Sequence, residues 1–138
     1  MGIIFAQSVV RENPRQLYLY HKSYFMISMD AVILAGGRGE RLRPVTDYIP
    51  KPLVPICNIP ILEWQISYLE RYDIKRVILC SGYKSEMLRN FVERRKFKAD
   101  LVLSDEIKPL GTGGALKNAA SLISVSYTHL TLPTKRIV

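Results

Sequence analysis

The chain has 138 residues, enough for one modest domain, and 48% of them are apolar. No apolar run approaches the ~20 residues that a membrane-spanning helix needs, so a membrane is not an expected partner. The net charge of +8 would suit a nucleic-acid-binding protein, but residues 29–124 carry only +4 and no motif of combined aromatic and basic residues appears, so nucleic acid is not expected either.

Residues 1–28 show no clear periodicity, although residues 16–20 are compatible with a short strand. They also lack the basic start, apolar centre and small-residue exit of a signal peptide. Met29 directly precedes the first strongly apolar segment. We therefore expect the domain to begin at residue 29, with residues 1–28 outside it. A misassigned start codon would explain them, and a genuine upstream extension is the alternative.

From residue 29 onward, apolar strands alternate with amphipathic helices. In chain order the expected elements are a strand over 31–34, a helix from Pro60 to about 72, a strand over 76–80, a helix over 84–95, a strand over 99–103 and a helix over 113–123. This alternation predicts an α/β fold, Rossmann-like, with a doubly wound and mainly parallel sheet. Ligands of such sheets lie beyond the carboxyl ends of the strands, so the loops after Leu34, Cys80 and Leu103 should converge.

The loop after the first strand has the composition of a phosphate-binding segment. Gly36, Gly37 and Gly39 let the backbone approach an anion and point N–H groups at it, and Arg41 adds a forked, permanent cation. Lys51 follows as a compact charge between two prolines that restrict its backbone. These residues together predict a nucleotide site. The sequence leaves open whether Arg38 and Arg43 take part or are solvated.

Two familiar phosphate loops are excluded by the spacing. A P-loop ends in Gly-Lys-Ser/Thr, whereas Gly39 is followed by Glu40 and Arg41. The dinucleotide-binding fingerprint that would begin at Gly37 requires a third glycine where Leu42 stands.

A third segment, residues 106–115, reads Glu-Ile-Lys-Pro-Leu-Gly-Thr-Gly-Gly-Ala. Gly111 would allow a base or ribose to lie against bare backbone, and Thr112 is a candidate cap for the helix that follows. The carboxylate of Glu106 can only accept hydrogen bonds, which matches the adjacent N1–H and 2-amino donors of guanine. We therefore favour GTP, with a thymidine or uridine nucleotide as the alternative. Glu106 would otherwise be solvated, and base choice would be set elsewhere.

The pattern Gly-Gly-x-Gly-x-Arg-Leu-x-Pro at 36–44, with Pro-Lys-Pro at 50–52, resembles the signature of the sugar-1-phosphate nucleotidyltransferases. Residues 106–115 resemble the corresponding stretch of mannose-1-phosphate guanylyltransferases and their close relatives. The resemblance covers residues from about 29 to about 123. Glu40 departs from it, because the family often has Thr or Ser there.

This resemblance implies attack by a sugar 1-phosphate on the α-phosphorus of a nucleoside triphosphate, which yields a nucleotide-sugar and pyrophosphate. Arg41 would contact the departing phosphates, and Lys51 would contact phosphate at the reaction centre. The implied nucleotide-binding residues are Leu34, Ala35, Gly36, Gly37, Gly39, Glu40, Glu106, Gly111 and Thr112.

Mg²⁺ is the cofactor that the resemblance implies. The family's metal-binding Asp lies in an Asn/Asp-Gly-Asp-type segment just after the third helix, and this sequence has no such segment. Asp100 and Asp105 precede the glycine-rich 111–114 loop and are not its equivalents. No metal ligand is therefore assigned within the sequence.

Residues 125–138 resemble the translation of a sequencing-library adaptor, so we expect them to be read-through and not native, with a short edge strand as the alternative. The domain would then be the N-terminal nucleotide-binding half of a longer enzyme, inactive by itself. A non-catalytic nucleotide- or nucleotide-sugar-binding regulatory subunit is the alternative function, and a homo-oligomer stays open. Cys57 and Cys80 have no metal-type spacing and are expected to be reduced core thiols of a cytoplasmic protein.

Overall fold

The computed structural model describes residues 3–9, 27–123 and 130–131. Its main sheet has the order β6-β5-β2-β1-β7. The strands are β1 (Ile3–Val9), β2 (Ile27–Leu34), β5 (Arg76–Ser81), β6 (Asp100–Asp105) and β7 (Leu130–Thr131). Strands β2, β5 and β6 are parallel, as predicted from the alternation of strands and helices.

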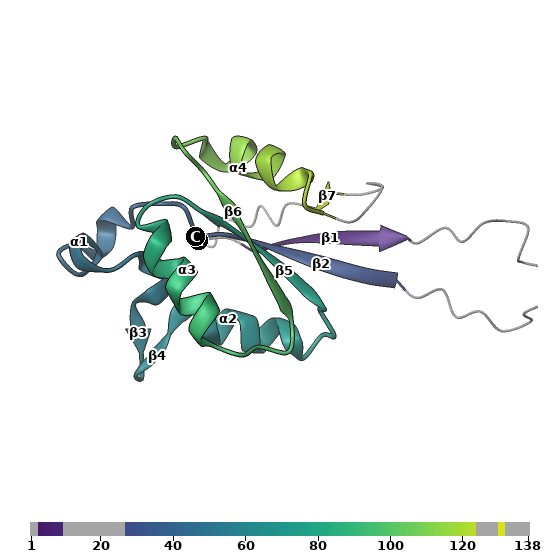
Figure 1. Ribbon diagram of the computed structural model, residues 1–138, viewed down its shortest axis with the longest axis horizontal. Helices are drawn as coiled ribbons and strands as arrows, with labels where there is room; N and C mark the ends of the chain where they lie inside the picture. The colour runs from purple at the N-terminus through teal and green to yellow at the C-terminus, as the bar shows by residue number, and fades with distance from the viewer. Residues whose placement is uncertain (1–2, 10–26, 124–129, 132–138) are drawn as a thin grey trace, which may run out of the picture.

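Three longer helices cover the two faces of this sheet (Figure 1). Helices α2 (Ile61–Glu70) and α3 (Ser85–Arg94) lie on one side, and α4 (Gly111–Ala120) lies on the other. Between β2 and α2 the chain forms 3-10 turns at Glu40–Leu42 and Lys51–Leu53, the short helix α1 (Val45–Tyr48), and a hairpin of β3 (Pro55–Ile56) and β4 (Ile59–Pro60). All six predicted strands and helices are present, with boundaries shifted by a few residues.

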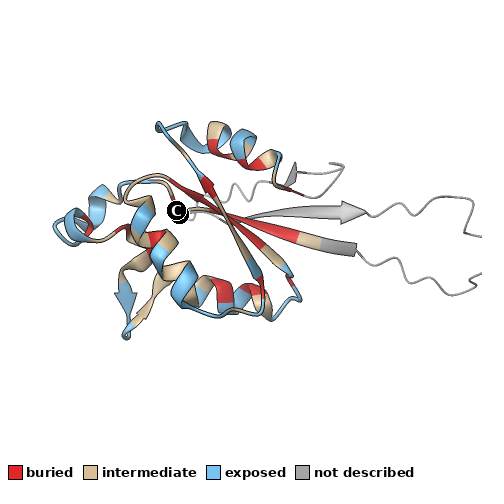
Figure 2. Cartoon of the chain, in the orientation of Figure 1, coloured by how far each residue is buried: buried red, intermediate tan, exposed pale blue. Residues whose placement is uncertain are grey.

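The side chains of β2 alternate between two cores, because successive strand residues point to opposite faces. Ala31 and Ile33 pack toward α2 and α3, whereas Val32 packs toward α4. Strand β5 repeats this pattern, with Val77 and Leu79 in the first core. Figure 2 shows the resulting band of buried residues along the strands. The expectation that the first apolar strand is covered on both faces is confirmed.

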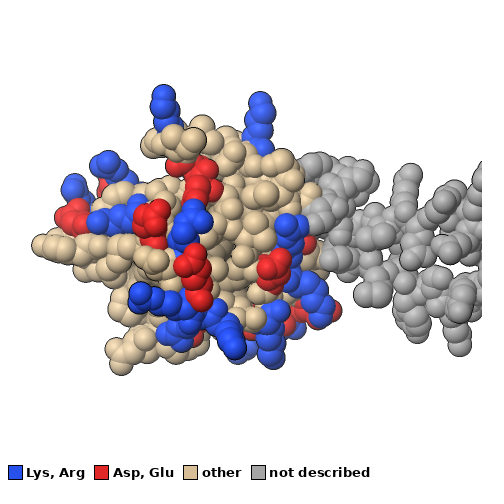
Figure 3. Space-filling view, viewed as in Figure 1, with Lys and Arg blue, Asp and Glu red and all other residues tan. Residues whose placement is uncertain are grey.

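The start of the sheet carries a row of charges in register. Asp30 of β2 is opposite Arg76 of β5, which is opposite Asp100 of β6. The Nε atom of Arg76 lies 4.0 Å from Oδ2 of Asp100, and Asp30 is buried. In this register the three strands carry charges of alternating sign. Basic and acidic side chains are likewise interspersed over the face of the molecule that Figure 3 shows.

Strand β1 runs antiparallel to β2 along the edge opposite β5, from Ile3 opposite Ile33 to Val9 opposite Ile27. No strand was predicted at this position, and the short strand considered at 16–20 lies outside the described residues. Of residues 125–138, the structure describes only Leu130 and Thr131, which pair with β1.

Candidate functional site

Three loops converge beyond the carboxyl ends of β2, β5 and β6 and enclose a cavity of about 710 Å³. The convergence predicted from the parallel sheet is confirmed. The lining residues are Leu34, Gly36, Gly37, Arg38, Gly82, Tyr83, Glu106, Ile107, Pro109, Gly111, Thr112 and Ala115. A second hollow of about 110 Å³ continues along the glycine-rich loop and is lined by Leu34, Ala35, Gly37, Gly39, Lys51 and Pro52.

The glycine-rich loop is held against the end of β5 by close backbone contact. The amide of Tyr83 donates to the carbonyl of Gly36 at 3.1 Å. A methyl group added to Gly82 would lie 3.2 Å from that same carbonyl oxygen, so this approach favours a residue without a side chain. Gly36 is thereby fixed at the wall of the cavity.

Gly39 has φ +67°, in the left-handed region that glycine adopts without steric cost. A Cβ at this position would lie 3.0 Å from both Cβ of Lys51 and Cγ2 of Thr46. The loop therefore packs directly on Lys51, whose exposed fraction is intermediate and which lines the smaller hollow.

Two residues that the sequence analysis did not assign connect the phosphate loop to β5. The hydroxyl of the buried Thr46 donates to the carbonyl of Gly39 at 3.0 Å. The hydroxyl of Tyr83 donates to the carbonyl of Thr46 at 2.9 Å. Tyr83 lies in the loop after Cys80 that was predicted to reach the site, but its partner is 37 residues earlier in the chain, so spacing alone could not identify it.

Glu106 follows the last residue of β6 and projects into the larger cavity. Its Oε2 accepts a hydrogen bond from the amide of Leu110 at 3.2 Å. Its Oε1 would lie 3.4 Å from a Cβ on Gly36, so the carboxylate faces the start of the glycine-rich loop. Burial, with a smaller contribution from the nearby Glu106 carboxylate, raises the pKa of the Cys80 thiol to about 11.

The predicted cations take different positions. Arg38 lines the larger cavity, and its guanidinium lies 5.7 Å from the ring centroid of Tyr83. Arg43 points to solvent and pairs with Asp47 at 2.8 Å. Arg41 and Glu40 are exposed in the 3-10 turn and line neither cavity. The structure thus brings Lys51 to the smaller hollow, whereas Arg41 lines neither cavity.

The expectation that Thr112 caps the third helix is wrong. Helix α4 begins at Gly111, two residues earlier than predicted, and the preceding Leu110 makes no capping hydrogen bond through its side chain. Gly111 takes φ +67°, which allows the tight entry into the helix and places Thr112 in its first turn. Both residues still line the larger cavity.

Cys57 also differs from expectation. It is exposed, because it forms the turn between β3 and β4 with Asn58, and both residues have positive φ. Cys80 is buried, as predicted.

Within the described ranges, no three His, Cys, Asp or Glu residues gather closely enough to hold a metal ion. No helix in the same ranges combines the length and apolar character that crossing a membrane requires.

The parallel sheet, the glycine-rich loop with Lys51, and the cavity at the strand ends define a nucleotidyltransferase-type domain. The sequence profile of the Nucleotidyl transferase family matches residues 30–137, and the chain belongs to this family.

Among curated relatives, the chain is 46% identical over 91 residues to the D-glycero-alpha-D-manno-heptose 1-phosphate guanylyltransferase of Aneurinibacillus thermoaerophilus. It is 43% identical over 98 residues to the catalytic subunit beta of mannose-1-phosphate guanylyltransferase from Danio rerio. These matches cover 66% and 70% of this chain, but only 40% and 27% of the relatives. The chain thus spans less than half of their length.

Solved structures also match this chain over less than half of their own length. HddC from Yersinia pseudotuberculosis, complexed with GMP-PN, matches with a TM-score of 0.63 and 42% identity, over 69% of this chain and 43% of that one. UDP-glucose pyrophosphorylase from Acinetobacter baumanii matches with a TM-score of 0.56 at 21% identity, over 67% of this chain and 40% of that one, and supports the fold alone.

Proposed function

We propose that this protein takes part in transfer of a guanylyl group from GTP to a sugar 1-phosphate, which gives a nucleotide-sugar and pyrophosphate. The observation that carries the proposal is the Glu106 carboxylate at the wall of a cavity that continues into the glycine-rich loop. A base-recognition group and a phosphate-binding segment thus share one continuous site. The relatives that are named guanylyltransferases support the same assignment.

Glu106 carries the preference for guanine. One of its oxygens already accepts from the Leu110 amide, and each carboxylate oxygen has a further lone pair for a ligand. Guanine presents two adjacent N–H donors to such a group, whereas the Watson–Crick edge of adenine presents an unprotonated N1 that a carboxylate repels. Glutamine at this position would both donate and accept, and would suit a pyrimidine edge.

The phosphates extend from the base site along the glycine-rich loop. Lys51 reaches the smaller hollow and supplies the charge at the reacting phosphate. Arg41 is exposed near the far end of the loop, where its guanidinium is free to fold onto the β- and γ-phosphates when GTP binds. In-line attack on phosphorus requires positioning and charge neutralisation more than covalent help from the protein. Mg²⁺ is the expected cofactor, and when bound it would offset the negative charge of the phosphates.

The test is nucleotide binding by the 138-residue chain, measured by isothermal titration with GTP, ATP, UTP and GMP. We expect GTP to bind best, and Glu106→Gln to reduce the GTP preference by about tenfold, the discrimination of one bidentate contact. Arg41→Ala should weaken GTP by about tenfold while leaving GMP unchanged, because one charge-assisted contact is worth about 1.5–3 kcal/mol. Equal affinity for all three triphosphates in the unsubstituted chain would contradict the assignment.

Because the chain spans less than half of its relatives, we further propose that these residues alone bind GTP without turnover. Pyrophosphate release from GTP and mannose 1-phosphate should therefore be undetectable with the 138-residue chain in the presence of Mg²⁺. Release at an enzymatic rate would contradict this second part and leave the binding assignment intact.

A further inference from the structure

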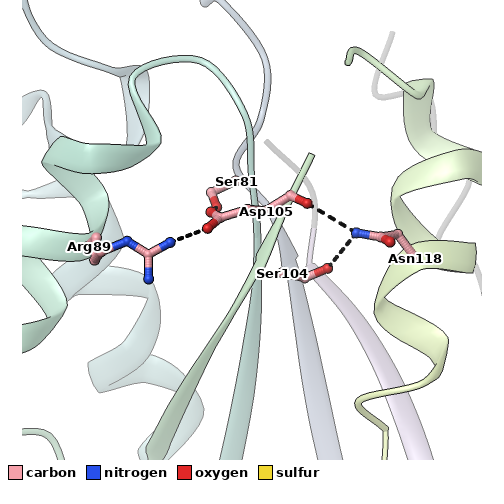
Figure 4. A network of polar contacts seen from close by, with 5 residues as sticks. All are labelled: Ser81, Arg89, Ser104, Asp105 and Asn118. Carbon is pink, nitrogen blue, oxygen red and sulfur yellow. Dashed lines mark hydrogen bonds and ion pairs between the residues drawn. The ribbon is translucent and has the colours of Figure 1, made fainter. Parts of the chain in front are cut away.

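The end of β6 is held by side chains from both faces of the sheet (Figure 4). On one face, Asp105 accepts a hydrogen bond from the hydroxyl of Ser81 and forms an ion pair with Arg89 of α3. On the other face, the amide of Asn118 of α4 donates to Oγ of Ser104 at 3.1 Å and to the carbonyl of Asp105 at 3.3 Å. Two helices on opposite sides of the sheet are thereby tied to the last two residues of one strand.

This network borders directly on Glu106. The amide of Glu106 donates to the carbonyl of Ser81 at 2.8 Å, and the side chain of the same Ser81 donates to Asp105. Because consecutive residues of an extended chain point to opposite faces, fixing Asp105 toward α3 directs Glu106 toward the cavity beside α4. None of Ser81, Arg89, Asp105 and Asn118 lines the cavity itself.

We propose that Asp105, clamped by Ser81 and Arg89, is a positioning residue that sets base selectivity by fixing the direction of the Glu106 carboxylate. This inference rests on the proposed function, because it concerns how Glu106 discriminates guanine. Bidentate recognition depends strongly on angle, so a small rotation at the strand end loses one of the two hydrogen bonds. Asn118 acts in the same way from the opposite face.

The burial of the partners explains why Asp105 holds its place. Ser81 is fully buried, so its hydroxyl cannot replace the lost hydrogen bond with one to water if Asp105 is removed. The ion pair with Arg89 is about 40% exposed on each side, and its direct energy is correspondingly small. The Ser81 hydrogen bond therefore fixes the carboxylate, and Arg89 orients its second oxygen.

The test measures the affinities of the 138-residue chain for N-methylanthraniloyl GTP and for the matching ATP analogue by fluorescence titration. Asp105→Ala should lower the GTP-to-ATP affinity ratio by about tenfold, through weaker GTP binding, because one of two hydrogen bonds to guanine is lost. Asp105→Asn keeps an acceptor for Ser81 and should retain most of the ratio. Asp100→Ala is the matched control, since Asp100 lies on the same strand beside Arg76 but at the opposite end from the cavity.

Each outcome decides the inference. If the unsubstituted chain binds no nucleotide, the proposed function and this inference both fail. If that chain prefers GTP and Asp105→Ala keeps the same ratio, the inference alone fails. It also fails if Asp100→Ala lowers the ratio as much, because the effect would then be general loosening of the sheet. Should Asp105→Ala not fold, Asn118→Ala replaces it, since Asn118 is exposed and its loss should still lower the ratio.

Discussion

Replacement of Gly39 tests whether the phosphate loop is shaped by its backbone or by its contact with Lys51. Placing alanine at φ +67° costs roughly 1–2 kcal/mol, because an L-residue in the left-handed region brings Cβ against the next carbonyl. The new methyl would also lie 3.0 Å from side-chain atoms of Lys51 and Thr46. Such overpacking adds about 1 kcal/mol or more. We therefore expect Gly39→Ala to destabilise the chain by about 2–3 kcal/mol.

Two further variants separate these contributions. Gly39→Asn retains the tight contact, but asparagine tolerates the left-handed region, so its cost should be about half that of alanine. Gly113→Ala is the control, because Gly113 has no positive φ and no heavy atom within 4 Å of its added methyl. It lies in α4 and should stabilise the chain by about 0.5–1 kcal/mol. Urea unfolding followed by circular dichroism measures all three. If Gly39→Ala is as stable as the unsubstituted chain, the reasoning is refuted. If Gly39→Ala and Gly39→Asn lose the same unfolding free energy, the left-handed backbone conformation contributes nothing to the cost.

Three other predictions follow from the fold. Tyr83→Phe removes the hydrogen bond to the Thr46 carbonyl and should lower the unfolding free energy by about 1 kcal/mol in the same urea assay, with weaker GTP binding in titration. Ellman's reagent should titrate one thiol, Cys57, in the native chain and reach Cys80 only in denaturant. Burial raises the pKa of the Cys80 thiol from 9.0 to about 11, so its contribution to stability is full below pH 9 and is lost as the pH rises through about 11. Urea unfolding measured across this pH range would detect the loss. Leu88→Ala empties a fully buried position and should cost about 2–5 kcal/mol, and a change below 0.5 kcal/mol would contradict its place in the core.

The regular elements were predictable because their apolar residues recur with a strand or helix period. Helix α3 is a clear case, since its buried Leu88 and half-buried Phe91 and Val92 share one face. The parallel order then indicated which loops meet, and the structure brings these loops together around one cavity. Local pattern and topology were thus sufficient for the place of the site.

The interior of the phosphate loop was not predictable in the same way. Its 3-10 turns and the four-residue α1 are too short for any periodic signal. The contacts of Tyr83 with Thr46 and of Asp105 with Ser81 join residues distant in sequence, and no spacing rule identifies such pairs. The turn that exposes Cys57 had a weak indication in the sequence, because the neighbouring Asn58 is typical of tight hairpin turns. An apolar neighbourhood in sequence concealed that turn.

The row of Asp30, Arg76 and Asp100 also bears on how the sheet assembles. In the observed order each aspartate is in register with the arginine of the central strand. If β6 docked beside β2 in place of β5, two carboxylates would face each other, a pairing that costs up to about 1 kcal/mol. Arg76 thus favours the strand order in which β5 lies between β2 and β6. The charges at one end of the strands help to choose their order, and that order brings the nucleotide-site loops together at the other end.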